Sequence, residues 1–421
     1  MKKSQKWMAL TATFALGTTI LAGCSTTPTS AAAPVRKASA PIHLTVGMWS
    51  SSPAEHSLVE SQVKLFEKQN PNIKVSVRVI NGNYLQVLQP MLASHTAPDI
   101  FYLDSSVAPQ LEASGALMNL DQYIKRDHVN LSDFNPHLLS AFKWKGSYYG
   151  VPKDFNSLAL EYNKSLMAKA GIKTPPATWQ QLQQDAVKLK AKHIAPLSMP
   201  VDVARYYPFV LDFGGNYFNP NTNQATFPNP KNRAGLGYFM NMVENGSIVQ
   251  PNALNGASWA GQAFAENKVA MVAEGAWLLP FMQQTAPKLQ YGISRFPSYN
   301  GKSYNMLYTV SYSMAAATKY PAQAAKLLFF MTGPAAEKLT AQSGLAIPSR
   351  SSEQKYFLKQ NPSYAAFVAG GKDAVPYQFG TLGQNFVDAI NNATLAGILK
   401  KQSPSVVLSS ATKTLSSQSN Y

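Results

Sequence analysis

The segment from residue 42 to residue 103 alternates between two hydrophobic periods, and this alternation constrains the fold more than any other feature. Apolar residues occupy every second position over 42–48 and again over 73–79, which is the period of a β-strand. Between them, Pro53–Gln69 carries apolar side chains at helical spacing. Residues 100–103 are entirely apolar, as is typical of a parallel strand covered on both faces. The order strand, helix, strand, helix, strand predicts an open α/β sheet.

The chain length and the later segments extend this prediction. At 421 residues the chain exceeds what one hydrophobic core usually organises, so we expect two globular units. Another extended segment begins at Gly150, and helical spacing recurs over 178–192, 232–244 and 321–331. The Asn- and Pro-rich segment 219–230 predicts a turn or hairpin.

The N-terminal segment has the features of an export signal. Three lysines precede an apolar stretch over 7–20, and residues 21–24, Leu-Ala-Gly-Cys, resemble a bacterial lipobox, in which lipid is attached to the cysteine sulfur. We therefore predict a signal peptide over 1–23, fatty acylation such as palmitate at Cys24, and a disordered Ser/Thr/Ala/Pro tether over 24–40. A free cysteine after an ordinary signal is the alternative. The expected location is extracytoplasmic, anchored by lipid to the cell membrane.

The charge balance is unusual and limits the possible partners. Lys and Arg number 37 against 21 Asp and Glu, a formal net charge of +16, yet only 14% of residues are charged. About 25% is typical of soluble proteins, so the basicity comes mostly from missing acids. Because the basic residues are scattered without an arginine-rich run, we expect no nucleic-acid partner. A scarcity of carboxylates also suits an acidic environment; that hypothesis would fail if stability peaked near neutral pH.

Most enzyme chemistries lack support in the sequence. The single cysteine excludes internal disulfides and thiolate zinc sites, and no HExxH, GxSxG, Walker or GxGxxG pattern occurs. Asn-rich residues 219–223 mimic the spacing of a calcium loop but lack its carboxylates and glycine. We predict no metal and no cofactor. Acid pairs such as Asp104 with Asp154 or Glu161 keep a secreted carbohydrate-active enzyme as an alternative.

Seven further segments share motifs with one known family. They are residues 66–75, 97–102, 150–164, 175–179, 213–215, 270–277 and 344–350. Together with the lipobox, and in this order, they resemble the family 1 extracellular solute-binding proteins, the receptors of bacterial ABC importers for sugars, of which maltodextrin-binding proteins are familiar members. The resemblance covers nearly the whole mature chain.

The resemblance implies the α/β, type II periplasmic-binding-protein fold, in which two interleaved lobes joined by a hinge enclose a ligand cleft. It places crossings between the lobes near Gly150, near Ser311–Met314 and near Ala346. The implied boundaries are 41–150 plus 312–345 for lobe one and 151–311 plus 346–421 for lobe two.

A sugar-binding cleft needs polar groups for hydroxyls and aromatic rings for apolar sugar faces. The loop after the first strand offers Trp49, Ser50 and Ser51, and Asp104 follows the third strand, where ligands of open α/β sheets bind. The structural alternatives are core packing for Trp49 and a helix N-cap for Asp104. By resemblance, Trp277 is the strongest candidate to stack on a sugar ring, although core packing is its alternative. The family also implies Asp154 and Asn156 on the first crossing segment and a stacking tyrosine at Tyr206 or Tyr207, of which the other is expected to pack inward. Tyr308 and Tyr377 are looser candidates.

The resemblance implies a monomeric binding protein, not an enzyme. It would capture an oligosaccharide by lobe closure and deliver it to the membrane permease of an ABC importer. Asn156 stands where maltodextrin binders often carry a glutamate, so the same sugar is not implied. The alternatives are the same fold with a non-sugar ligand such as a polyamine, or the secreted carbohydrate-active enzyme. The sequence leaves open an acidic sugar, the linkage, length and affinity of the ligand, the permease, and the roles of Arg205 and Arg350.

Overall fold

The computed structural model of the protein describes residues 40–418. Within this range, residues 41–418 form one compact unit. The predicted signal peptide, the lipid attachment at Cys24 and the predicted tether up to residue 39 lie outside the described residues.

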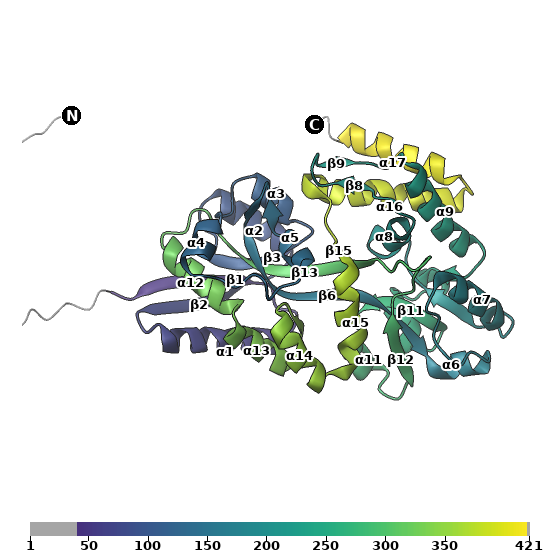
Figure 1. Cartoon of the computed structure of the whole chain (residues 1–421), viewed down its shortest axis with the longest axis horizontal. Coiled ribbons are helices and arrows are strands. Elements are labelled where there is room, and N and C mark those ends of the chain that lie inside the picture. The colour runs from purple at the N-terminus through teal and green to yellow at the C-terminus, as the bar shows by residue number, and fades with distance from the viewer. Residues whose placement is uncertain (1–39, 419–421) are drawn as a thin grey trace, which may run out of the picture. The chain divides into compact units, whose positions relative to one another are not determined.

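An 11-stranded sheet forms the centre of the compact unit, with the main order β10-β7-β11-β6-β13-β3-β1-β2. Strands β1, β3, β13 and β6 of this sheet run through the middle of the view in Figure 1. At one end, β1 (Ile42–Met48) pairs in parallel with both β2 (Ile73–Val79) and β3 (Ile100–Asp104). Helices α1 (Pro53–Gln69) and α2 (Tyr84–Ala93) connect these strands. The predicted α/β class and its first strands and helix are therefore confirmed.

The middle of the sheet is built from segments far apart in the sequence. Strand β6 (Gly150–Asn163) pairs antiparallel with β13 (Asn305–Met314) along its first half, and β14 (Ile347–Pro348) pairs with β6 at Phe155 and Asp154. The three segments that the resemblance gives as crossings thus lie side by side. At Gly150 a Cβ atom would come within 2.5 Å of the Ser311 Oγ, so the close approach of these strands requires glycine.

The second half of β6 organises the other end of the sheet. There it pairs antiparallel with β11 (Val269–Gly275) and with β12 (Tyr291–Arg295). Strand β7 (Ala195–Ser198) pairs in parallel with β11 and with β10 (Ile248–Val249), while β15 (Ala374–Pro376) pairs with β13. The sheet is consequently mixed, and β6 is shared by both of its ends.

Helices flank the sheet where apolar spacing predicts them. Helix α7 (Trp179–Lys190) begins after Thr178, whose side chain accepts a hydrogen bond from the Gln181 backbone N–H at 3.1 Å. The predicted turn over 219–230 contains the hairpin of β8 (Phe218–Asn219) and β9 (Gln224–Ala225). The other long helices are α8 (Val203–Asp212), α9 (Pro230–Glu244), α11 (Leu278–Thr285), α12 (Pro321–Met331), α13 (Pro334–Ser343), α14 (Ser351–Gln360), α16 (Gly383–Leu399) and α17 (Pro404–Gln418).

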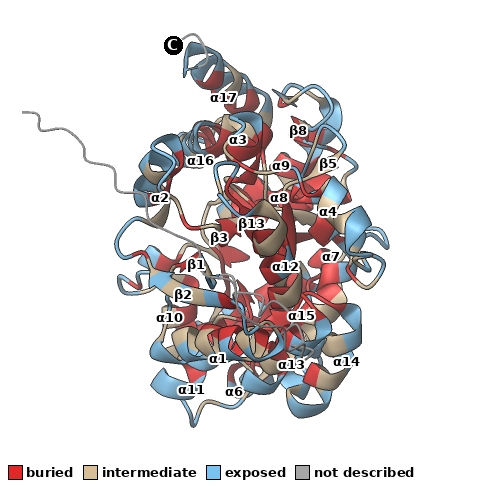
Figure 2. Ribbon diagram, turned by 90° about the vertical axis from the view of Figure 1, so that its left-hand side faces the viewer, coloured by how far each residue is buried: buried red, intermediate tan, exposed pale blue. Residues whose placement is uncertain are grey.

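The strands are largely buried, while the outer faces of the helices are exposed (Figure 2). One large apolar cluster draws on residues between 158 and 415, and another combines residues 44–151 with 312–331. Within residues 40–418, no helix has both the length and the apolar character needed to cross a bilayer. The same residues contain no cluster of His, Cys, Asp and Glu side chains suited to a metal ion.

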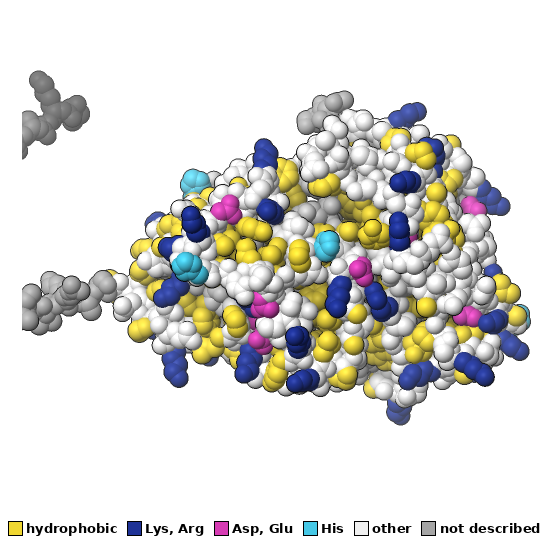
Figure 3. Space-filling view, viewed as in Figure 1, with side chains coloured by type: hydrophobic (Ala, Val, Ile, Leu, Met, Phe, Trp, Pro, Cys, Tyr) yellow, Lys and Arg dark blue, Asp and Glu magenta, His cyan; other side chains and the backbone are white. Residues whose placement is uncertain are grey.

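Basic side chains are dispersed over the face drawn in Figure 3, singly or in small groups. Acidic side chains are sparse on the same face. This distribution agrees with the expectation that the high net charge reflects missing acids rather than a concentrated basic surface.

Candidate functional site

A cavity of about 430 Å³ lies where the ends of several strands converge, and we call it the central cavity. Its volume falls in the range of small-molecule sites, about 300–1,000 Å³. Seven of the eleven predicted binding residues line it: Trp49, Ser51, Asp104, Asp154, Asn156, Trp277 and Tyr308. A wider groove of about 890 Å³ elsewhere shares none of the residues that line the central cavity.

Trp49 follows β1 and reaches the central cavity half-buried. Its ring makes edge contacts with Tyr84 and Tyr102, with ring centroids 4.9 and 5.0 Å apart. These contacts fix the orientation of the Trp49 ring before a ligand binds. Binding therefore costs little further side-chain entropy at this residue. Trp49 therefore combines partial core packing with an accessible surface in the cavity.

Asp104, at the end of β3, holds the chain that follows it. One carboxylate oxygen accepts hydrogen bonds from the Ser106 backbone N–H at 2.8 Å and from the Ser106 hydroxyl at 2.5 Å. Burial raises the pKa of Asp104, and these two hydrogen bonds partly oppose the rise. Asp104 thus has a local structural role and also lines the cavity.

Strand β6 contributes a charged pair to the cavity. Lys153 forms an ion pair with Asp154, and its ammonium group lies 4.2 Å from the centre of the Tyr102 ring. Burial lowers the pKa of Lys153, but the carboxylates of Asp154 and Glu55 outweigh this effect, so the pKa is raised overall. Lys153 therefore stays charged, and its partners hold it in place.

Trp277 follows β11 and is positioned by a buried ion pair. The indole Nε1–H donates to the Glu274 carboxylate at 3.0 Å, and Arg205 donates to the same oxygen at 2.8 Å. The Arg205 guanidinium also lies 5.3 Å from the centre of the Trp277 ring. Gly275 lets this ring lie against the backbone, because a Cβ atom there would come within 2.2 Å of it. The ring orientation is thus set by three neighbours.

Tyr308 and Asn156 complete the wall around Trp277. Tyr308 packs edge-on against the Trp277 ring, with the ring centroids 5.5 Å apart. The Tyr308 hydroxyl donates to the Ala204 carbonyl oxygen and accepts from Arg205 at 3.1 Å. The Asn156 side-chain carbonyl accepts from the Ala276 backbone N–H at 3.0 Å, which ties β6 to the Trp277 loop.

The other four predicted residues do not line the central cavity. Tyr206 is fully buried, stacks on Phe239 and shares a hydroxyl hydrogen bond with Thr394. Tyr207 is also buried, and its hydroxyl donates to the side chain of Asn216 at 2.5 Å. One of these two tyrosines was expected to pack inward, and in the structure both rings fill the core around α8.

Ser50 and Tyr377 also lie off the cavity wall. Ser50 is exposed, and its hydroxyl donates to the Ser52 carbonyl oxygen at 2.8 Å. Tyr377 lies behind Tyr308, with the ring centroids 5.7 Å apart. Both residues therefore support their neighbours rather than line the central cavity.

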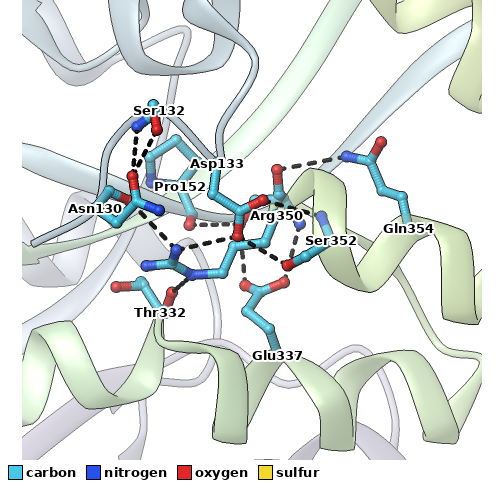
Figure 4. A network of polar contacts seen from close by, with 10 residues as sticks. Asn130, Ser132, Asp133, Pro152, Thr332, Glu337, Arg350, Ser352 and Gln354 are labelled. Atoms are coloured by element: carbon cyan, nitrogen blue, oxygen red, sulfur yellow. Dashed lines mark hydrogen bonds and ion pairs between the residues drawn. The ribbon is translucent and has the colours of Figure 1, made fainter.

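The structure assigns internal roles to both arginines that the sequence left open. Arg205 holds Glu274 and Tyr308 behind Trp277, outside the cavity lining. Arg350 is buried, donates to the Thr332 carbonyl oxygen at 2.6 Å and pairs with Asp133 at 3.3 Å (Figure 4). Arg350 therefore joins the end of α12, the start of α14 and the loop before α5 (Pro136–Ser140).

Among the lining residues that were not predicted from the sequence, Glu55, Tyr102 and Lys153 carry the charges and the ring that meet at β6. Glu55 lies in the first turn of α1, where an acid is an ordinary helix-start feature. Tyr102 lies inside a buried strand, which gives no sign of a cavity. Lys153 is adjacent to a predicted residue, and its position in the β6 motif was the one available signal.

Glu161, named above in a possible catalytic acid pair, is fully buried and does not line the cavity. Burial and then the charge of Glu274 raise the pKa of Glu161 well above its usual value. Asp104 and Asp154 do share the cavity, but each is held by neighbouring residues of the same chain.

The mixed α/β sheet and the cavity at its centre agree with the fold of the periplasmic binding proteins. Residues 50–338 match the family model of the bacterial extracellular solute-binding proteins. The chain therefore belongs to this family.

Individual relatives agree with this assignment. A binding protein of Brucella abortus (strain 2308) is 27% identical over 384 residues, which cover 88% of this chain and 91% of the relative. The multiple sugar-binding protein of Streptococcus mutans is 25% identical over 290 residues, covering 64% of this chain and 66% of the relative. The structure of an ABC substrate-binding protein of Listeria monocytogenes in complex with cycloalternan superposes with a TM-score of 0.76 at 24% identity, covering 90% of this chain and 100% of that chain.

Proposed function

We propose that this protein is the substrate receptor of an ABC importer and that it captures an oligosaccharide in the central cavity. The observation that carries the proposal is the placement of Trp49 and Trp277 on one cavity. They come from opposite ends of the sheet, and carboxylate and amide side chains line the same cavity. Aromatic rings suit the apolar faces of sugars, and carboxylates and amides suit their hydroxyls. The relative that binds multiple sugars supports the same ligand class.

Capture would proceed by closure of two lobes. We place lobe one at 41–150 plus 312–345 and lobe two at 151–311 plus 346–421, with the hinge where β6, β13 and β14 adjoin. A ligand that contacts both lobes only in the closed arrangement shifts the population toward that arrangement. The closed form would then be recognised by the membrane permease subunits. No bond is made or broken in this cycle.

The proposal includes an extracytoplasmic monomer that is anchored through lipid at Cys24. The family assignment supports a location outside the cytoplasm. The lipobox-like residues 21–24 support the lipid anchor.

A polyamine ligand is the second candidate, because three carboxylates line the cavity. Each carboxylate already has a partner: Glu55 accepts from the Ser51 backbone N–H, Asp104 accepts from Ser106, and Asp154 pairs with Lys153. These carboxylates are half-buried, and their partners already orient them as fixed hydrogen-bond acceptors, while Lys153 neutralises the charge of Asp154. A sugar, which needs hydrogen-bond acceptors rather than free charges, fits this arrangement better.

Isothermal titration tests the proposal directly. The purified protein is titrated with malto-, xylo-, cello-, galacto- and fructo-oligosaccharides and with spermidine, and the mixtures are then analysed for shortened sugars by chromatography. We expect saturable binding of one sugar class at one ligand per chain, with the sugar recovered intact. Binding of spermidine without any sugar would overturn the sugar assignment, and shortened sugars would overturn the receptor assignment.

A further inference from the structure

The start of helix α1 faces the central cavity, and a helix start is normally a favourable place for an anion. Unpaired backbone N–H groups and the helix dipole both attract negative charge there. Ser51, Ser52 and Glu55 at this helix start line the cavity. An acidic sugar would find its natural anchoring point here if these groups were free.

The protein fills this anion site with its own carboxylate. Glu55 accepts a hydrogen bond from the Ser51 backbone N–H at 2.8 Å, and the Ser52 hydroxyl accepts from the Glu55 backbone N–H at 3.2 Å. The negative charge of Glu55 also compensates the helix dipole. A carboxylate or phosphate of a ligand would therefore meet a negative charge at this position instead of free donors.

The single cationic side chain in the described cavity lining is also occupied. The Lys153 ammonium pairs with Asp154 and lies over the Tyr102 ring, and its side chain is only 13% exposed. The nearby guanidinium of Arg205 lies outside the lining and is used by Glu274 and Tyr308. No cation is thus left to pair with an acidic ligand among the residues that line the cavity.

The net charge of the cavity lining is opposite in sign to the net charge of the whole chain. The cavity lining carries three acidic side chains, Glu55, Asp104 and Asp154, against Lys153 alone, whereas the chain has a net charge of +16. Because a closed cavity excludes water, the repulsion between these carboxylates and an acidic ligand is stronger there than the same repulsion would be at the protein surface. The net charge of the protein therefore does not predict the charge of its ligand.

We propose that the central cavity selects uncharged sugars and rejects sugars of the same size that bear a carboxylate or phosphate group. This inference rests on the proposed function and names the ligand class within it. Glu55 and Asp154 are its specificity-determining residues: Glu55 blocks the anion site at the start of α1, and Asp154 neutralises Lys153.

The test compares neutral and acidic sugars of equal length. The protein is titrated with two pairs of neutral and acidic sugars, which are galactotriose with trigalacturonate and xylotriose with an aldouronic acid built on xylose. Cellotriose and maltotriose are added as further neutral sugars. We expect at least one neutral sugar to bind and every acidic sugar to bind at least about tenfold more weakly than that sugar, because the repulsion acts at short range in a partly desolvated cavity.

Variants then test the two residues. Asp154→Asn frees the Lys153 ammonium, and Glu55→Gln removes the negative charge from the helix start while keeping an acceptor for Ser51, so each is expected to raise the affinity for trigalacturonate about tenfold. Glu266→Gln is the control, since it removes the same charge from a residue outside the cavity lining that pairs with Lys268. Two independent variants keep the test decisive if one of them folds poorly.

The outcomes separate the two claims. Acidic sugars that bind as tightly as neutral ones, or variants that leave acidic sugars as weakly bound as in the parent, overturn the selection while the proposed function stands. Silence toward all saccharides, neutral and acidic alike, overturns the proposed function and the inference with it.

Discussion

Removing the Arg205 side-chain charge should destabilise the protein far more than removing an exposed arginine. Arg205 is only 16% exposed and pairs at 2.8 Å with Glu274, which is 2% exposed. Arg205→Gln leaves the buried Glu274 carboxylate without its cation. Breaking one partner of a buried pair typically costs about 3–5 kcal/mol of unfolding free energy.

The assay is chemical denaturation followed by circular dichroism, with two further variants. Arg295→Gln breaks an ion pair with Asp373 whose partners are 54% and 57% exposed, so we expect a loss of less than about 1 kcal/mol. The double variant Arg205→Gln, Glu274→Gln removes both charges together and should be more stable than Arg205→Gln alone. The reasoning is refuted if Arg205→Gln costs no more than Arg295→Gln, or if the double variant loses the sum of both single effects.

Two further predictions concern the Trp277 loop and the buried acids. Gly275→Ala should push the Trp277 ring out of place and weaken sugar binding, measured by titration, about tenfold. Gly261→Ala is the control, because it crowds the Trp259 ring in the same way outside the cavity lining, and it should leave the affinity unchanged. Burial raises the pKa of Glu112 from its ordinary 4.5 to about 8, so the unfolded chain releases this proton first as the pH rises. The contribution of Glu112 to the unfolding free energy should therefore be fully present below about pH 4.5 and be lost as the pH rises toward 8, and Glu112→Gln should flatten that fall. Parent and Glu112→Gln proteins whose unfolding free energies change in parallel between pH 4.5 and pH 8 in the denaturation series would contradict this.

The elements that depend on hydrophobic period were predictable from the sequence. Helix α1 has the bounds Pro53–Gln69 that its apolar spacing predicts, and the Ser52 side chain caps it at the expected start. The sequence pattern also indicated the segments after β1 and β3 as the place for a site, because the carboxyl ends of parallel strands meet at the same edge of a sheet. In the structure both segments line the central cavity.

One feature of the cavity could not be predicted from sequence patterns: the presence of both Lys153 and Asp154 in its lining. Consecutive residues of a regular strand point to opposite faces, so a strand pattern alone does not bring both Lys153 and Asp154 to one cavity. The register between β6 and β13 shifts here, because Val310 pairs with Asp154 and Ser311 with Pro152, which leaves Lys153 as an extra residue. Both side chains consequently line the cavity.

Helix α8 shows a second limit of sequence patterns. Most of its residues are buried, so hydrophobic spacing gives no cavity-facing side by which Tyr206 and Tyr207 could be placed. Only the tertiary packing against Phe239 and Tyr217 reveals that both rings belong to the core.

The central claim is that one sugar is held between Trp49 and Trp277, and titration of single variants tests it most directly. With the sugar class that binds the parent protein, we expect Trp49→Ala and Trp277→Ala each to weaken binding by about tenfold or more, since truncating an anchoring tryptophan typically costs about 2 kcal/mol. Trp259→Ala is the control, because Trp259 packs on Phe281 outside the cavity lining. Affinities of the Trp49 and Trp277 variants equal to that of the Trp259 variant would contradict the claim.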